Sequence, residues 1–209
     1  MIEELSESAL EELKRADHSI YVSLKYTRTV DIIKNTIKRL LSAYDISIIQ
    51  GLEWAKENKK LPTIPPSSRL RAQLIVKFYP QMKKSIDFYN RLKVIDKADY
   101  KKKEEYRKNV ALIAKIGSRK VEVSMDILGE FFDFTVCFSR GITEITNQKK
   151  FTDAKNVKVV LPVKKPKKEV KKKEPDVYKH GKLVKKKTTK KVVKKSYKIN
   201  PAAPKRYGY

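Results

Sequence analysis

The chain has 209 residues and a formal net charge of +26 at pH 7, with 50 Lys and Arg against 24 Asp and Glu. This excess is uneven, because residues 155–209 hold 21 basic and 3 acidic side chains whereas residues 1–154 hold 29 and 21. With one cysteine, Cys137, and two histidines, the chain excludes an internal disulfide and lacks the ligands for a zinc site. We expect a globular domain over residues 1–150, long enough to bury a core, and a basic tail over residues 151–209.

No segment indicates export or membrane insertion. The N-terminus, Met1–Leu5, is acidic where a signal peptide needs positive charge, and the most apolar run, Ile127–Phe138, is interrupted by Glu130 and Asp133. Cys137 lies in this run and is interpreted as a small buried apolar residue. The sequence therefore predicts a cytoplasmic protein without membrane contact.

The segment Thr29–Asn58 forms the centre of the predicted fold. It contains no Pro and one Gly, and its apolar residues recur every three or four positions, which keeps one helix face apolar. These residues are Val30, Ile33, Ile37, Leu40, Leu41, Tyr44, Ile48, Leu52 and Ala55. Further apolar residues beside this stripe, such as Trp54, widen the face enough for partners on two sides. The pattern predicts the central helix of a mainly all-α, antiparallel bundle of four to five helices.

Helical spacing also predicts elements on both sides of the central helix. A first helix is expected over residues 5–26, followed by a bend at residues 27–31 with Thr29 as the N-cap, or by one unbroken helix. Three prolines predict a reversing loop over residues 59–67, and Ser67 or Ser68 should cap the next helix. That helix should stop at Pro80 and restart, with inward residues Leu70, Leu74, Ile75, Phe78, Met82, Ile86, Tyr89, Leu92 and Val94.

The apolar period changes after Lys101. Alternating residues on both sides of Gly117-Ser118 predict a small β-hairpin between Asn109 and Val123, although a helix through Tyr106, Val110 and Ile113 fits nearly as well. Ser124 should cap a final helix whose inward stripe is Ile127, Leu128, Phe131, Phe134, Thr135, Phe138, Ile142 and Ile145. An aromatic stripe at this spacing indicates core packing rather than a ligand site.

One run in the first helix carries a resemblance to known proteins. Residues Ala16–Asp31, with the sequence ADHSIYVSLKYTRTVD, resemble a group of small helical proteins of archaea, and the likeness extends over most of residues 5–145. In outline the domain is also similar to the HEPN superfamily, helical bundles often associated with RNA cleavage or with nucleotidyltransferase partners. The nuclease members carry an Arg followed four to six residues later by a His. Here His18 follows Arg15 by three residues and no histidine follows Arg107 at the required spacing, so the catalytic pattern is not matched.

The sequence predicts no enzyme, no cofactor and no metal. Asp126, Glu130 and Asp133 share one helix face, but a Mg²⁺ site usually draws ligands from several elements, which favours a solvated acidic face. His18 is interpreted as a surface or hydrogen-bonded core residue. The six glycines are scattered singly, so no phosphate-binding loop is present in the sequence.

Within the globular part, residues 97–108 are a candidate nucleic-acid patch. Cations that could contact phosphates alternate there with Tyr100 and Tyr106, whose rings could stack on bases. The cations chosen as candidate site residues are Lys101, Lys102, Lys103, Arg107 and Lys108. The alternative is a solvated helix end with both tyrosines turned into the core.

The tail gives the stronger indication of function. Too few apolar side chains accompany its lysines to offset the loss of chain entropy, so we expect it to be disordered when free. Lysine clusters bind polyanions by releasing counterions, and the preference for Lys over Arg favours charge attraction over base reading. The candidate nucleic-acid-binding residues are Lys164, Lys165, Lys167, Lys168, Lys171, Lys172, Lys173, Lys185, Lys186, Lys187, Lys190, Lys191, Lys194 and Lys195. The alternative for this composition is a tail that only raises solubility.

Two less charged stretches of the tail support a second function class. Val157–Val163 could add as an edge strand to a partner, and residues 197–209 contain three tyrosines and two prolines. The sequence thus predicts a non-enzymatic RNA- or DNA-binding protein with little sequence preference. A protein-interaction adaptor with docking peptides is the alternative, and a nuclease ranks below both.

Overall fold

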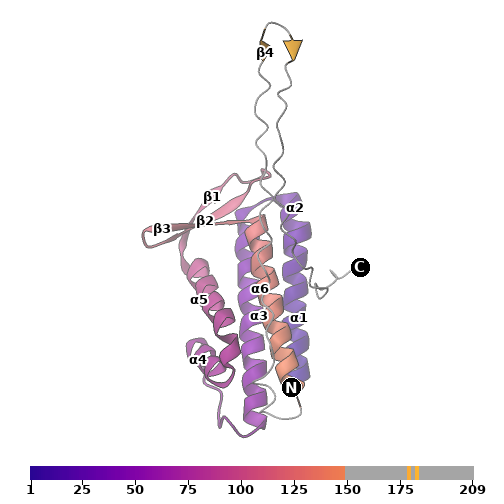
Figure 1. Cartoon of the computed structure of the whole chain (residues 1–209), viewed down its shortest axis with the longest axis vertical. Helices are drawn as coiled ribbons and strands as arrows, with labels where there is room; N and C mark the ends of the chain where they lie inside the picture. The colour runs from indigo at the N-terminus through magenta and orange to yellow at the C-terminus, as the bar shows by residue number, and fades with distance from the viewer. Residues whose placement is uncertain (149–177, 180–181, 184–209) are drawn as a thin grey trace, which may run out of the picture. The chain divides into compact units, whose positions relative to one another are not determined.

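The computed structural model describes residues 1–148, 178–179 and 182–183 (Figure 1). The chain divides into two units, of which the first spans Met1–Lys165 and the second Pro166–Tyr209. The elements of the first unit are α1 Ile2–His18, the π-helical turn η1 Ser19–Ser23, α2 Leu24–Thr27, α3 Val30–Glu57, α4 Ser68–Phe78, the 3₁₀ turn η2 Pro80–Met82, α5 Lys83–Lys97, β1 Asp99–Lys103, β2 Ala111–Ile116, β3 Arg119–Ser124 and α6 Met125–Thr146.

The long helix α3 lies at the centre of a helical bundle, as predicted. In Figure 1, α1 and α6 lie on one side of it and α4 and α5 on the other. Helices α1 and α5 run antiparallel to α3, whereas α6 runs parallel to it, as Figure 1 shows. Two hydrogen bonds agree with the parallel pairing, because Ser47 Oγ donates to Ser139 Oγ at 3.1 Å and Gln50 Nε2 donates to Thr146 Oγ1 at 3.1 Å. The mainly helical fold class with a small sheet is confirmed.

The bend between the first helix and α3 is confirmed, but its cap differs from the prediction. Arg28 ends α2 in the left-handed conformation, with φ 50°, and Thr29 is extended at the N-cap of α3. The Thr29 side chain makes no cap hydrogen bond. Instead the first free N–H of α3, that of Val30, donates to Glu105 Oε1 at 3.2 Å. The cap is supplied by a distant residue, which local sequence cannot reveal.

The proline loop over residues 59–67 reverses the chain as predicted, and the following helix is interrupted at Pro80. Ser67 is the N-cap of α4, yet neither serine supplies a side-chain cap, since Ser68 Oγ accepts a hydrogen bond from Lys93 Nζ at 2.7 Å. The predictions for Leu70 and Val94 were wrong, because these side chains are 49% and 48% exposed. Ile95 is buried in place of Val94.

The predicted hairpin corresponds to β2 and β3 of a three-stranded antiparallel sheet with the order β1-β2-β3. Leu112 and Ala114 of β2 are buried and lie opposite Val123 and Val121 of β3. Strand β1 was not predicted, and it pairs with the other edge of β2, placing Lys102 opposite Leu112. Because side chains alternate between the two faces of a strand, Lys101 and Lys103 lie on the face opposite to Tyr100 and Lys102.

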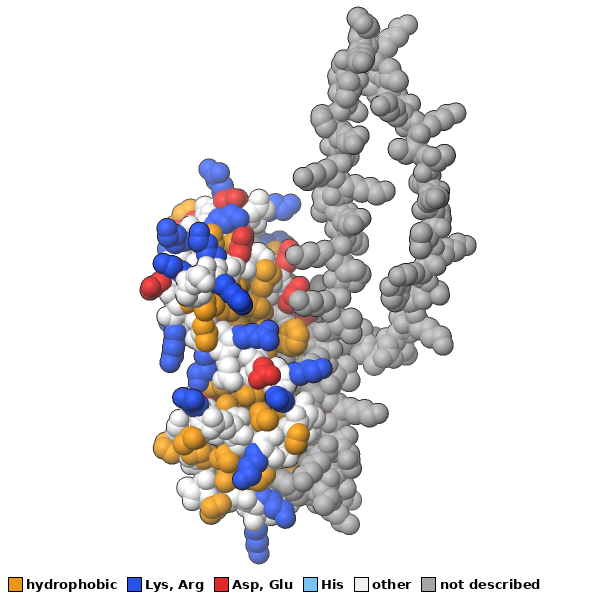
Figure 2. All heavy atoms as spheres, turned by 60° about the vertical axis from the view of Figure 1, so that its left-hand side comes forward, with side chains coloured by type: hydrophobic (Ala, Val, Ile, Leu, Met, Phe, Trp, Pro, Cys, Tyr) orange, Lys and Arg blue, Asp and Glu red, His pale blue; other side chains and the backbone are white. Residues whose placement is uncertain are grey.

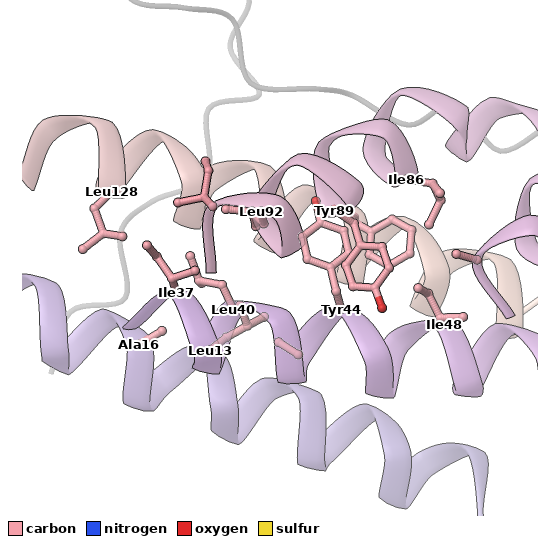
Figure 3. Packing of buried hydrophobic residues seen from close by; sticks show 14 of the residues in the cluster. Leu13, Ala16, Ile37, Leu40, Tyr44, Ile48, Ile86, Tyr89, Leu92 and Leu128 are labelled. Carbon is pink, nitrogen blue, oxygen red and sulfur yellow. The ribbon is translucent and has the colours of Figure 1, made fainter. Parts of the chain in front are cut away.

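The core is a continuous apolar cluster that joins all the long helices to the sheet. Figure 3 shows Leu13 and Ala16 of α1, Leu40 and Tyr44 of α3 and Leu92 of α5 converging in it. The aromatic residues of α6 belong to this core, since the ring of Phe138 stacks on that of Tyr44 with centroids 4.7 Å apart. The interpretation of the aromatic stripe as core is therefore correct.

Gly51 lets α3, α4 and α6 approach closely. A Cβ atom at this position would lie 2.9 Å from Ile75 Cδ1 and 3.3 Å from Ile142 Cδ1. The absence of a side chain thus outweighs the entropic cost of a glycine inside a helix, which is about 0.5–1 kcal/mol relative to alanine.

A polar cluster ties α3, α4 and α5 together beside this core. Tyr89 Oη donates to Asp45 Oδ1 at 2.6 Å, and Lys93 Nζ donates to Tyr89 Oη at 3.0 Å as well as to Ser68 Oγ. Tyr89 is fully buried, and its burial, followed by the contact with Asp45, raises the pKa of its hydroxyl. The buried hydroxyl therefore keeps its proton and satisfies the Asp45 carboxylate.

In the second unit the structure describes two short strands, β4 Tyr178–Lys179 and β5 Lys182–Leu183, which pair antiparallel with Tyr178 opposite Leu183. The sequence analysis did not predict this pairing. The candidate lysines from Lys164 to Lys195, the segment Val157–Val163 and residues 197–209 lie outside the described residues, as does the expected disorder around them. Over the described part of the chain, none of the helices combines the length and apolarity that crossing a bilayer requires.

Candidate nucleic-acid interface

The loop between β1 and β2 lies against the turn between α2 and α3. The backbone N–H of Tyr106 donates to the carbonyl oxygen of Arg28 at 2.8 Å. Both residues adopt the left-handed conformation, with φ 64° at Tyr106 and φ 50° at Arg28, and Glu104 does so as well, with φ 50°. Few residues other than glycine adopt this conformation without local support, and here the hydrogen bond between the two turns supplies it.

Glu105 and Lys102 fasten the same loop to the start of α3. Glu105 Oε1 accepts the Val30 N–H and also lies 3.2 Å from Lys102 Nζ, which in turn lies 3.2 Å from Asp31 Oδ2. The hydrogen bond to Asp31, and then that to Glu105, raises the pKa of the Lys102 ammonium. Lys102 is thus a bridge between two carboxylates and keeps its charge.

The five cations predicted for this patch fall into two groups. Lys102 is held by Asp31 and Glu105, and Lys103 Nζ lies 2.9 Å from Glu122 Oε1, so the positive charge of both is compensated by neighbouring carboxylates. Lys101, Arg107 and Lys108 are exposed and make no ion pair within the described part of the chain. These three can therefore contact phosphates without breaking a contact within the protein.

The two tyrosines of the patch also differ. Tyr100 is 37% exposed, and the ammonium of Lys34 lies 4.6 Å from the centroid of its ring. Tyr106 is 74% exposed, so the alternative of a ring turned into the core is wrong for this residue. Only the ring of Tyr106 offers a largely open face for stacking.

The structure adds residues that the sequence reasoning missed. Because the Arg28 carbonyl holds Tyr106, the end of α2, which carries the exposed residues Lys25, Tyr26 and Arg28, adjoins the β1–β2 loop. Tyr26 is 77% exposed, and Lys25 Nζ lies 5.9 Å from the centroid of its ring. A sequence signal existed, since Lys25 and Arg28 lie close to Tyr26 in the sequence, just as Arg107 and Lys108 follow Tyr106. We call Lys25, Tyr26, Arg28, Tyr106, Arg107 and Lys108 the tyrosine–cation surface.

The two segments that form this part of the surface carry a net positive charge. Residues 25–31 and 97–108 together hold eight Lys and Arg against four Asp and Glu. Figure 2 shows the face that carries α4 and α5, where Lys and Arg side chains gather toward the sheet end and acidic side chains lie among them. Such a surface attracts polyanions, although the local carboxylates limit the attraction.

Elsewhere in residues 1–148 the candidate catalytic groups do not come together. Asp126, Glu130 and Asp133 are exposed on α6, and the described residues contain no cluster of three potential metal ligands. His18 is an exposed helix residue. Cys137 is half-buried rather than fully buried, and burial, as the largest cause, raises the pKa of its thiol, which is opposite to the activation a nucleophile needs.

A shallow depression of about 300 Å³ is lined by Glu12, Asn35, Lys38 and Arg39. Arg39 Nη1 lies 3.4 Å from Glu12 Oε2, so its main charged groups neutralise each other. The depression offers no pair of a nucleophile and a base.

Comparison with protein-family models, with curated proteins and with solved structures finds no match to this chain.

Proposed function

We propose that this protein binds nucleic acid, RNA or DNA, through phosphate contacts, with little sequence preference and without catalysing a reaction on it. The observation that carries the proposal is the charge of residues 155–209, which hold 21 basic and 3 acidic side chains. Neutralising nucleic-acid phosphates releases condensed counterions, and this release supplies most of the free energy of non-specific binding.

The end of α2 and the β1–β2 loop of the folded unit support the same function. Lys25, Arg28, Arg107 and Lys108 are exposed there, next to two exposed tyrosines. Lys102 and Lys103 should contribute less than the sequence analysis expected, because a phosphate would have to compete with Asp31 and Glu105 for Lys102 and with Glu122 for Lys103. The main contacts of the folded unit should therefore come from the tyrosine–cation surface.

The proposal is tested with two variants of the full chain, one that removes and one that keeps the positive charge at the same positions. The first variant carries Gln and the second carries Arg in place of Lys164, Lys165, Lys167, Lys168, Lys171, Lys172 and Lys173. Binding to labelled 20-base-pair duplexes of several scrambled sequences is measured by fluorescence anisotropy at 100 mM salt. We expect the Gln variant to lose at least tenfold in affinity and the Arg variant to retain it, equally for all sequences. Unchanged binding by the Gln variant would contradict the proposal.

The absence of catalysis is a separate part of the proposal. The sequence has no histidine that follows an Arg at the spacing of the HEPN nucleases, and no pair of an acid and a base can be recognised in it, as general acid–base catalysis requires. We expect labelled RNA to remain intact after prolonged incubation with the protein and Mg²⁺. Cleavage that is abolished by Asp126→Asn would overturn this part and would make the acidic face of α6 a metal site.

A further inference from the structure

Two tyrosine rings stand out among the aromatic residues of the folded unit. Tyr26 is 77% exposed and Tyr106 is 74% exposed, whereas Tyr44, Tyr79 and Tyr89 are fully buried. An exposed aromatic ring contributes nothing to the core, and two such rings on adjoining turns form a surface on which a flat partner can lie.

The positions of these rings are fixed by the backbone. Tyr26 lies two residues before Arg28, whose carbonyl oxygen accepts the hydrogen bond from the N–H of Tyr106 at 2.8 Å. The neighbouring Glu105 is anchored on Val30 and Lys102. Although the two tyrosines are far apart in sequence, they are carried by two turns that are tied together, so little ordering is needed when a ligand contacts both.

The flanking charges identify the chemistry of the partner. Lys25 and Arg28 flank Tyr26, and Arg107 and Lys108 follow Tyr106 directly. None of these four cations takes part in an ion pair within the described part of the chain. The guanidinium of Arg28 donates through Nε to the backbone carbonyl of Lys25 at 3.2 Å and keeps its charge uncompensated by a described carboxylate. Alternation of exposed rings with such cations fits a strand that presents flat bases and phosphates together.

We propose that Tyr26 and Tyr106 stack on unpaired bases of single-stranded nucleic acid while Lys25, Arg28, Arg107 and Lys108 contact the adjoining phosphates. This inference rests on the proposed function and deepens it, because a duplex keeps its bases stacked on one another and offers the tyrosines no free ring face. The tail lysines bind any phosphate backbone, and the tyrosine–cation surface selects single strands. Base stacking of this kind tolerates every sequence, since each base has a π face.

The test separates stacking from charge by removing the bases. The full-length protein is titrated into two labelled 20-mers with equal numbers of phosphates, an oligothymidylate and an abasic strand, and binding is measured by fluorescence anisotropy at 150 mM salt. We expect the oligothymidylate to bind roughly tenfold more tightly or better. The double variant Tyr26→Leu/Tyr106→Leu should lose this difference while it binds the abasic strand as the unmodified protein does.

Two matched variants complete the design. Tyr26→Phe/Tyr106→Phe keeps the rings and should retain the preference for bases, and Tyr100→Leu removes a ring already covered by Lys34 and should also retain it. Equal affinity of the unmodified protein for both strands, or a preference that survives in the double Leu variant, would overturn the stacking platform but leave the proposed function standing. If the protein binds neither strand nor a duplex, the proposed function fails together with this inference.

Discussion

The backbone N–H of Tyr106 donates to the carbonyl oxygen of Arg28 at 2.8 Å, and both residues adopt the left-handed conformation. This hydrogen bond joins the turn that ends α2 to the loop that follows β1. Glu105 of the same loop accepts a hydrogen bond from Val30 at the start of α3. The loop therefore both caps the central helix and carries part of the tyrosine–cation surface. A change that loosens the β1–β2 loop should therefore affect both stability and binding.

Replacing Glu105 tests this coupling. Glu105→Ala removes the acceptor of the Val30 N–H, and we expect a loss of about 0.5–2 kcal/mol in the free energy of unfolding, as for other helix N-caps. Glu105→Gln keeps an acceptor oxygen at the same position and should lose less. Urea denaturation of the three proteins measures the difference. If the Ala variant is as stable as the unmodified protein, the loop does not cap α3.

Truncating a buried residue of α3 tests the assignment of its core face. Ile37 is 1% exposed, and Ile37→Ala should cost about 2–5 kcal/mol by removing buried methyl groups and leaving a cavity. Leu41 is half-buried, so Leu41→Ala should cost less than the sequence pattern alone suggested. Lys38→Ala, at an exposed position between them, should change stability by no more than about 0.5 kcal/mol. Similar costs for Ile37 and Lys38 would place the apolar face elsewhere.

Three buried tyrosines predict a loss of stability at alkaline pH. Burial raises the pKa of Tyr44, Tyr79 and Tyr89 above the value of about 10 that an unfolded chain would show. Above that pH the unfolded state loses these protons while the folded state keeps them. The free energy of unfolding should therefore be unaffected by these groups below about pH 10 and should fall above it, by up to about 1.4 kcal/mol per pH unit for each tyrosine.

Tyr79→Phe isolates one of these contributions. The variant loses the hydrogen bond from Tyr79 Oη to the Gly51 carbonyl, which lowers its stability at every pH, but it should show a shallower decline above pH 10. Urea denaturation at pH 9, 10 and 11 measures the two slopes. Identical slopes would show that Tyr79 titrates alike in both states.

The apolar core predicts that the globular part folds without the basic tail. Among the described residues, the buried core cluster runs from Leu13 to Ile145 and draws on all the long helices and on the sheet. A protein shortened to residues 1–150 should unfold in one sharp thermal transition. An insoluble product, or one without a cooperative transition, would indicate that residues such as Val157–Val163 contribute to the core.

The helices were predictable because each has a long apolar stripe at helical spacing. The α3 stripe and the aromatic stripe of α6 were identified with the correct faces, and the prolines between residues 62 and 66 located the reversing loop. Strand β1 was not predicted, because its sequence, Asp99–Lys103, has no apolar alternation and its side chains are mostly exposed. Its position is set by pairing with β2, a non-local contact, and lysines are usual on such edge strands.

The candidate surface was predictable only in part. Composition made Arg107 and Lys108 candidates and left open whether Tyr106 is exposed. Whether a lysine is free or paired depends on residues far away in sequence, as the contacts of Lys102 with Asp31 and of Lys103 with Glu122 show. Tyr26 was overlooked because it lies near the end of the predicted first helix, far in sequence from residues 97–108. Long-range contacts, among them the hydrogen bond between Arg28 and Tyr106, bring the turn that follows Tyr26 to the β1–β2 loop.

The salt dependence of binding tests the central claim most directly. If eight of the 21 cations in residues 155–209 contact phosphates of a duplex, a plot of log K against log salt concentration should have a slope of about −7, from roughly −0.9 per neutralised phosphate. The slope should be the same for unrelated duplex sequences and should flatten when Lys155–Tyr209 are removed. A shortened protein that binds one sequence tightly at high salt, together with a shallow slope for the full chain, would contradict the account and make the folded unit the recognition module.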